Sequence, residues 1–122
     1  MSLLARRLAE RRGRSAERLC LWVLRLKGWR ILARDLKLPV GEIDIIARRG
    51  RVLAAIEVKA REELDSAAHA VTPRQRRRIA RALAWFLARR PDLARLSPRF
   101  DVMLLVPGRL PRHIVAAWRA DE

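Results

Sequence analysis

Apolar and polar positions in the first third of the chain predict a helix followed by a strand. Between residues 15 and 27 the apolar side chains recur at helical spacing, and Gly28 supplies a helix stop. Residues 29–35 (WRILARD) then alternate between apolar and polar, which predicts a strand. Pro39 belongs to the turn that follows, because proline cannot donate a ladder hydrogen bond. Residues 1–13 are basic, and we expect them to fray or to extend the first helix.

Two apolar runs, residues 41–48 and 52–60, predict a β-hairpin. If Gly50 and Arg51 form a two-residue turn, the glycine takes the positive φ of the type II′ form. Both strands are largely apolar on both faces, which is typical of strands covered on two sides.

The second half of the chain predicts one helix and two more strands. Residues 61–71 form a loop, and the Thr-Pro pair after it predicts a helix over residues 72–90, with threonine as N-cap and proline in the first turn. Residues 99–106 read as a buried strand and residues 112–118 as the last strand. The order αβββαβ(β) predicts an α/β fold with a mixed central sheet, in a single domain over residues 1–122.

Charged residues interrupt the apolar hairpin. The register set by the turn places Asp44 opposite Glu57 and Glu42 opposite Lys59. Glu57 and Lys59 are two residues apart, so their side chains project from the same face of the strand. Two carboxylates brought together repel each other unless a cation lies between them, and a hard divalent metal such as Mg²⁺ binds oxygen ligands of this kind. The neutral alternative is an exposed Glu–Lys pair on an edge strand and an aspartate that caps a turn.

Two further polar residues lie on the apolar stripes of the predicted helices. Glu17 shares a stripe with Cys20 and Leu24, and Gln75 shares one with Ile79. A buried carboxylate needs a cation or hydrogen-bond donors. A buried glutamine either hydrogen-bonds to backbone groups or holds a water or a phosphate. The sequence does not decide between these two roles for Gln75.

Composition adds a strong positive charge to this picture. The chain has 28 Lys and Arg against 13 Asp and Glu, a net charge of +15. Such an excess favours a polyanionic partner, because each neutralised phosphate releases condensed counterions. One cysteine, Cys20, excludes an internal disulfide and a cysteine-based zinc site. No segment approaches about 18 uninterrupted apolar residues, and no signal peptide precedes the first helix, so we expect a cytoplasmic protein without a membrane partner.

Six segments, in order along almost the whole chain, carry a family resemblance: "GRSAE" (13–17), "GWRILARD" (28–35), "GEIDIIA" (41–47), "IEVKAR" (56–61), "VTPRQRRRI" (71–79) and "RFDV" (99–102). The pattern resembles the PD-(D/E)xK nuclease superfamily, which includes restriction endonucleases and archaeal Holliday-junction resolvases. It resembles most closely the YraN family of small bacterial proteins, which are predicted endonucleases. Ile43 stands where the superfamily has a proline, as is normal in this family.

The resemblance implies a restriction-endonuclease-like fold and a Mg²⁺ (or Mn²⁺) centre. Asp44 and Glu57 would ligate the metal, Glu17 would assist, Lys59 would act on the water or the scissile phosphate, and Gln75 would lie near the site. Asp101 matches a family position, and we expect a structural acid paired with an arginine there. Resolvase-like relatives are often dimers, which suits a two-stranded substrate.

These observations predict a metal-dependent DNA endonuclease, with DNA favoured over RNA. The alternative is a non-catalytic DNA- or RNA-binding module that retains the nuclease fold. A basic protein–protein or membrane-surface adaptor is the third hypothesis. The four tryptophans, Trp22, Trp29, Trp85 and Trp118, are candidates for stacking on unpaired bases or for packing. The arginines expected to hold the nucleic-acid backbone are Arg48, Arg61, Arg74, Arg77, Arg78 and Arg81.

Overall fold

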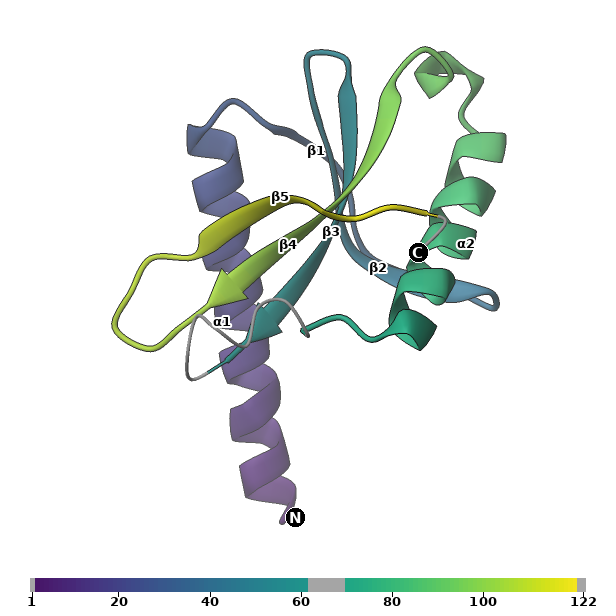
Figure 1. The fold of residues 1–122 in the computed structure, drawn as a ribbon. Coiled ribbons are helices and arrows are strands. Elements are labelled where there is room, and N and C mark those ends of the chain that lie inside the picture. Colours follow the sequence, from purple (N-terminus) through teal and green to yellow (C-terminus); the bar gives the residue numbers. More distant parts are fainter. Residues whose placement is uncertain (1, 62–69, 121–122) are drawn as a thin grey trace.

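A five-stranded mixed sheet lies between two helices in the computed structural model, which describes residues 2–61 and 70–120 (Figure 1). The predicted α/β class and the order αβββαβ(β) are therefore confirmed. The elements are α1 (Leu3–Leu26), β1 (Arg30–Leu38), β2 (Gly41–Arg49), β3 (Val52–Ala60), α2 (Pro73–Ala88), the short 3₁₀ helix η2 (Pro91–Leu93), β4 (Ser97–Leu105) and β5 (Arg112–Trp118). None of the described helices is long and apolar enough to cross a membrane.

Strands β1 to β5 are neighbours in chain order. All neighbouring pairs are antiparallel except β3 and β4, which are parallel. Because a parallel pair needs a crossover connection, the chain between β3 and β4 leaves the sheet, and α2 is part of that crossover.

The two helices bury opposite faces of the sheet, as the apolar runs predict. On the α1 side, Cys20 and Leu24 belong to one core cluster with Ile45 and Ile56. On the α2 side, the helix packs onto a second cluster that includes Ile46. Burial raises the pKa of the Cys20 thiol to about 12, so this cysteine is a packing residue and not a nucleophile.

Local signals in the sequence set most element boundaries. Gly50 has φ +59 while Arg51 has no positive φ, as the type II′ turn requires. Helix α1 begins at Leu3, so the basic N-terminal residues extend it. Strand β1 runs to Leu38, beyond the predicted end, because Pro39 lies in the β1–β2 turn, where its missing N–H costs no ladder bond.

Helix α2 begins with a capping box. The Gln75 backbone N–H donates to Thr72 Oγ1 at 3.2 Å, and the Thr72 N–H donates to Gln75 Oε1 at 3.0 Å. Pro73 occupies the first turn, where its missing N–H would have no helical partner. The predicted start of this helix is confirmed, and its end at Ala88 lies two residues before the predicted one.

Asp101 ties β5 to β4 and is fully buried. Arg99 donates two hydrogen bonds to its carboxylate, both at 2.8 Å, and the expected pairing with an arginine is confirmed. The carboxylate also contacts His113 Nε2 at 2.7 Å and accepts the Ala116 N–H at 2.9 Å. Burial opposes ionisation, but the hydrogen bonds outweigh it and lower the pKa of Asp101.

Gly41, the first residue of β2, lets this strand approach α2 closely. A Cβ atom at this position would overlap the backbone carbonyl group of Arg78. The overlap is with helix backbone, so a flexible side chain cannot relieve it. Since Arg78 and Gln75 of α2 both face the cavity described below, this close approach also sets where the helix stands relative to β2.

We predict that Gly41→Ala destabilises the protein, because the added methyl group must push α2 away from β2. The expected loss is about 1 to 3 kcal/mol in the free energy of unfolding, typical of overpacking, measured by urea denaturation. Gly13→Ala is the matched control, because nothing lies within 4 Å of the added Cβ in mid-helix α1. This control should stabilise by up to about 1 kcal/mol. Equal stability of Gly41→Ala and wild type would contradict the packing argument.

Candidate active site where strands β2 and β3 separate

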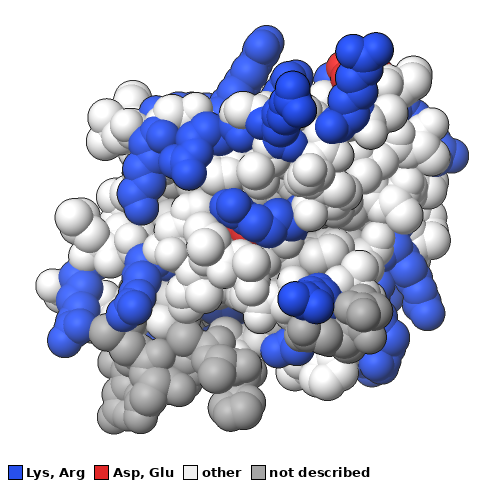
Figure 2. All heavy atoms as spheres, turned by 45° about the horizontal axis from the view of Figure 1, so that its top comes forward, with Lys and Arg blue, Asp and Glu red and all other residues white. Residues whose placement is uncertain are grey.

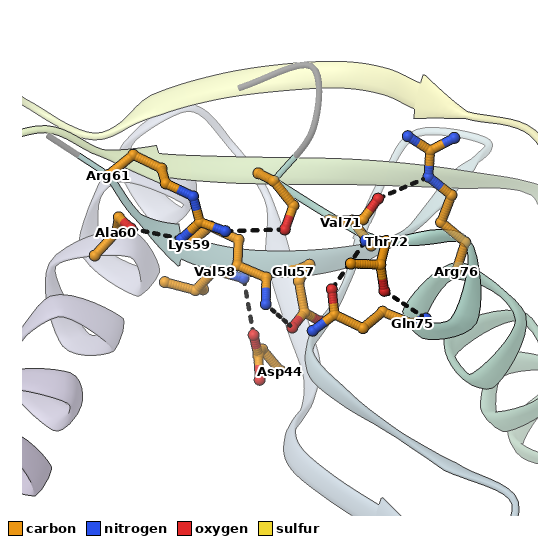
Figure 3. Close-up of polar contacts among 11 residues, drawn as sticks. Asp44, Glu57, Val58, Lys59, Ala60, Arg61, Val71, Thr72, Gln75 and Arg76 are labelled. Atoms are coloured by element: carbon orange, nitrogen blue, oxygen red, sulfur yellow. Dashed lines mark hydrogen bonds and ion pairs between the residues drawn. The ribbon is translucent and has the colours of Figure 1, made fainter. Parts of the chain in front are cut away.

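The β2–β3 hairpin opens at Asp44. Its ladder runs from Arg49–Val52 to Ile45–Ile56 and ends there. Beyond this point β2 continues alongside β1, while β3 continues alongside β4 (Figure 1). The Val58 N–H of β3 donates to Asp44 Oδ2 at 2.8 Å, so a side-chain carboxylate occupies the place of a backbone carbonyl (Figure 3).

This opening corrects part of the predicted register. Five pairs follow the register that the Gly50 turn fixes, but the next expected ones, Asp44 with Glu57 and Glu42 with Lys59, do not form. Glu42 instead pairs with Lys37 of β1. The physical reason is that each strand has its other partner to follow, and the carboxylate of Asp44 satisfies the N–H left behind on β3.

An open cavity of about 190 Å³ lies between the separated strands and helix α2. Its walls are formed by β2, β3 and the first turns of α2. The lining residues are Glu42, Asp44, Glu57, Gln75, Arg78 and Ile79. Three of the residues predicted to form the site, Asp44, Glu57 and Gln75, therefore meet in one place.

Lys59 accompanies Glu57 on β3, as their spacing predicts. Lys59 Nζ lies 3.7 Å from Glu57 Oε1, and the two side chains are only 17% and 15% exposed (Figure 3). A charge with this little solvent contact is weakly screened. The lysine therefore stands as a fixed positive charge beside the paired carboxyl groups.

The electrostatics of the carboxyl pair show that Lys59 compensates the burial of the two acids only in part. Burial, followed by the charge of Asp44, raises the pKa of Glu57 to about 8, although Lys59 opposes the shift. Burial also raises the pKa of Asp44, against the hydrogen bonds from Val58 and Glu57. Near neutral pH, Glu57 therefore keeps its proton and shares it with Asp44. A bound cation would favour the fully ionised pair.

Gln75 links the start of α2 to this pair. Its Oε1 accepts the Thr72 N–H of the capping box, which fixes the side chain. The amide nitrogen is turned toward Glu57 (Figure 3). The two readings of Gln75 given by the sequence are compatible, because one end of the amide caps the helix and the other faces the cavity.

Glu17 lies on the other side of Asp44, across the sheet from Glu57. It lines a cavity of about 440 Å³ together with Asp35 and Asp44, and Glu57 is not part of this wall. Burial, then the neighbouring Asp35, raises the pKa of Glu17 to about 7. Its Oε1 is buried without a hydrogen-bond partner among the described residues. Asp44 thus borders two cavities, one on each face of the sheet.

Asp35 is the residue of this region that the sequence reasoning missed. The pairs Arg34–Ile45 and Leu36–Ile43 bracket it, so it lies across the β1–β2 ladder from Asp44. Its φ of +50 is uncommon for a residue other than glycine. The signal was available, because an aspartate inside a strand pattern is unusual. The predicted strand ended at Asp35, so the prediction did not place this residue inside the strand that lies opposite Asp44.

The described residues fit a magnesium ion held mainly by water. No three His, Cys, Asp or Glu side chains among them stand close enough to form a ligand set. Mg²⁺ in proteins commonly uses one or two carboxylates and keeps several waters. The carboxyl groups of Asp44 and Glu57, which line one open cavity, match this requirement.

The arginines predicted to hold nucleic acid are spread over the molecule. Arg78 is half-buried in the wall of the smaller cavity. The guanidinium of Arg61 donates to the carbonyl groups of Ala60 at 2.7 Å and Ala70 at 3.1 Å, so it holds backbone (Figure 3). Arg48 lies at the turn end of the hairpin, where its Nε donates to Gly50 at 3.3 Å.

The remaining predicted arginines, Arg74, Arg77 and Arg81, are exposed on α2 at the three- and four-residue spacing of one helix face. Figure 2 shows Lys and Arg side chains dispersed over one face of the molecule, with little acidic surface among them. On this face the positive charge is therefore spread over a broad surface and does not form one compact patch, in a chain with a net charge of +15.

Comparisons with known proteins show the family of this chain. The sequence model named "Uncharacterised protein family UPF0102" matches residues 16–105. The chain is 58% identical over 111 residues to a UPF0102 protein of Parvibaculum lavamentivorans, covering 91% of this chain and 84% of that protein. It is 54% identical over 121 residues to one of Paramagnetospirillum magneticum, covering 96% and 94%. The chain therefore belongs to the UPF0102 family, which is the YraN family that its motifs resemble.

Proposed function

We propose that this protein is a Mg²⁺-dependent endonuclease that hydrolyses phosphodiester bonds in DNA. The observation that carries the proposal is the meeting of two largely buried carboxyl groups, Asp44 and Glu57, in an open cavity where β2 and β3 separate, with Lys59 beside Glu57. A folded protein gains no stability from such a pair, because burial and mutual repulsion both oppose ionisation. Its retention in a 122-residue chain is better explained by chemistry.

Asp44 and Glu57 would hold the metal ion. Asp44 is held in place by the Val58 N–H, and Glu57 is held by Lys59 and by the strand that carries both. When bound, Mg²⁺ supplies Lewis-acid stabilisation of the phosphate and activation of water. Glu17 and Asp35 reach Asp44 from the opposite cavity, so they would tune its position and charge without contacting the Glu57 side.

Lys59 and two side chains that line the cavity, Arg78 and Gln75, would act on the substrate phosphates or the attacking water. The Lys59 ammonium is placed to stabilise negative charge that develops on the phosphate oxygens or to orient the attacking water. Arg78 would bind a flanking phosphate, and the first turn of α2 adds the partial positive charge of a helix N-terminus. The free end of the Gln75 amide would orient a water or a phosphate oxygen.

The rest of the DNA backbone would bind the exposed arginines of α2. Arg74, Arg77 and Arg81 line one face of the helix that begins beside the cavity. Contacts of this kind supply affinity and register but do not read the base sequence. These contacts therefore give the proposed enzyme no selectivity for base sequence.

We predict that the purified protein cleaves branched or linear DNA in the presence of Mg²⁺ or Mn²⁺ and not in the presence of a chelator. Asp44→Asn and Lys59→Met should each lower the cleavage rate at least about 100-fold, the usual scale for one electrostatic or acid–base group. Both variants should still bind DNA, because neither removes an exposed arginine. Cleavage is measured on gels and binding by fluorescence anisotropy.

Asp92→Asn is the control variant, because Asp92 is exposed and pairs only with Arg90 among the described residues. It should cleave like wild type. DNA binding without cleavage under any metal would sink the nuclease proposal and favour a non-catalytic binding module. Cleavage that survives Asp44→Asn would point to a contaminant or to a different site.

We also predict that the stability of the metal-free protein falls as the pH rises from about 4.5 to about 8. The folded-state pKa of Glu57 is about 8 and its ordinary value is 4.5, so in this window the unfolded chain has lost a proton that the native state retains. Glu57→Gln should abolish much of this decline. Its advantage over wild type should grow by up to about 1.4 kcal/mol per pH unit within the window.

Mg²⁺ should reverse the order at pH 8. It should stabilise wild type, because the ion binds the native state and favours the ionised pair, and it should leave Glu57→Gln nearly unchanged. The free energy of unfolding is measured in urea at each pH, with and without Mg²⁺. Glu42→Gln, which removes an exposed carboxylate of β2 from the lining of the same cavity, should behave like wild type in pH dependence. Parallel pH profiles of Glu57→Gln and wild type would contradict the assignment.

A further inference from the structure

An exposed line of arginines runs along helix α1. Arg7, Arg14, Arg18 and Arg25 are all exposed. Their spacing of seven, four and seven residues places them on one side of the helix, over about 27 Å at about 1.5 Å per residue. The N-terminal part of α1 projects beyond the edge of the sheet, so this line extends past the body of the domain (Figure 1).

The arginine line passes the Glu17 cavity, which borders Asp44 on the face of the sheet opposite the Glu57 cavity. Arg14 lines the larger cavity together with Glu17, Asp35 and Asp44. Arg14 and Arg18 also line a smaller neighbouring cavity with the same Glu17 and Asp35. A polyanion that reaches Asp44 from this face of the sheet would therefore continue directly onto the line, in one direction toward Arg7 and in the other toward Arg25.

Trp22 adds an exposed aromatic surface to the same helix. It is 61% exposed, whereas Trp29 and Trp118 are buried in the core. The guanidinium carbon of Arg25 lies 6.0 Å from the centre of the Trp22 ring. An exposed indole next to arginines is the combination that binds unpaired nucleotides, since the base stacks on the ring while the phosphate pairs with the cation. Bases inside a duplex cannot stack in this way.

We propose that the α1 track, defined as Arg7, Arg14, Arg18, Arg25 and Trp22, binds a single-stranded segment of nucleic acid that flanks the cleavage site. This inference rests on the proposed function and names the form of the substrate. A second copy of the chain is a poor occupant, because it would bring arginines against arginines. An anionic membrane would attract the same charges, but it cannot enter the cavities that Arg14 and Arg18 border.

Oligonucleotide binding by three variants tests the proposal. Affinities for a labelled single strand and for the matching duplex are measured by fluorescence anisotropy over a range of salt concentrations. The triple variant Arg7→Gln, Arg14→Gln and Arg18→Gln should lower the salt slope for the single strand by about 2, at about 0.7 per lost phosphate contact. Trp22→Ala should weaken single-strand binding about 5- to 100-fold and affect the duplex much less, while Trp22→Phe retains most of the affinity.

A matched triple variant, Arg51→Gln, Arg95→Gln and Arg119→Gln, removes the same charge from exposed positions away from α1. Circular dichroism checks that every variant is folded.

Equal salt slopes for the two triple variants would overturn the proposal, and so would wild-type affinity of Trp22→Ala for the single strand. Binding to anionic phospholipid vesicles that depends on these residues, with oligonucleotide binding that does not, would assign the track to a membrane. If wild type cleaves DNA while these variants bind normally, only the α1 track fails; if wild type binds no oligonucleotide, the proposed function fails as well.

Discussion

The hydrogen bond from the Val58 N–H to the Asp44 carboxylate, 2.8 Å long, holds the hairpin open where the candidate site forms. Up to Ile45 and Ile56 the two strands share an ordinary ladder, and beyond them each follows a different neighbour. A backbone N–H at such a branch would otherwise lose its partner in a partly buried position, at a cost of about 1 to 3 kcal/mol. The partner here is the side chain of Asp44. The hydrogen bond that satisfies the Val58 N–H therefore also fixes a carboxylate between the separated strands.

The remaining architecture supports this branch. Two apolar clusters, one under each helix, cover the sheet on both faces, so its strands can separate at one end without losing the fold. At the far side of the sheet Asp101 of β4 contacts His113 and accepts the Ala116 N–H, both on β5. Gly41 brings α2 against β2, and the capping box orients the first turn that carries Gln75. The position of α2 at the cavity is therefore set by packing and by the capping box, and not by the carboxyl groups of the cavity.

The charges in the cavity oppose folding in the absence of a cation. The pKa of Glu57 is raised to about 8 and that of Glu17 to about 7, both chiefly by burial, on opposite sides of Asp44. The pKa of the buried Asp101 is lowered instead, because arginine and histidine compensate it. The direction of the pKa shift therefore distinguishes two kinds of acid in this protein: Asp101, whose pKa is lowered, and the acids near Asp44, whose pKa values are raised. The structural acid has enough hydrogen-bond donors to offset its burial, while Lys59 offsets the burial of Glu57 only in part.

Much of this arrangement follows from local sequence signals, and the rest depends on which strand pairs with which. The Gly50 turn fixes the hairpin register, and Thr72 with Pro73 fixes the start of α2, because both signals act within a few residues. The separation of β2 from β3 was not predictable in this way. It results from competition between β1 and β4 for these strands, which involves residues distant in the chain. The position of Asp35 was not predictable for the same reason. It lies opposite Asp44 only because β1 continues past it and pairs with β2.

The central claim is that Asp44 and Glu57 form a cation site. Crystals grown without divalent metal and then soaked in Mn²⁺ test it most directly, because the anomalous signal of the ion locates it without reference to activity. We predict an anomalous peak in the cavity between Asp44 and Glu57, lost in crystals of Glu57→Gln. A peak confined to the cavity of Glu17 and Asp35, or no peak at either place, would contradict the account.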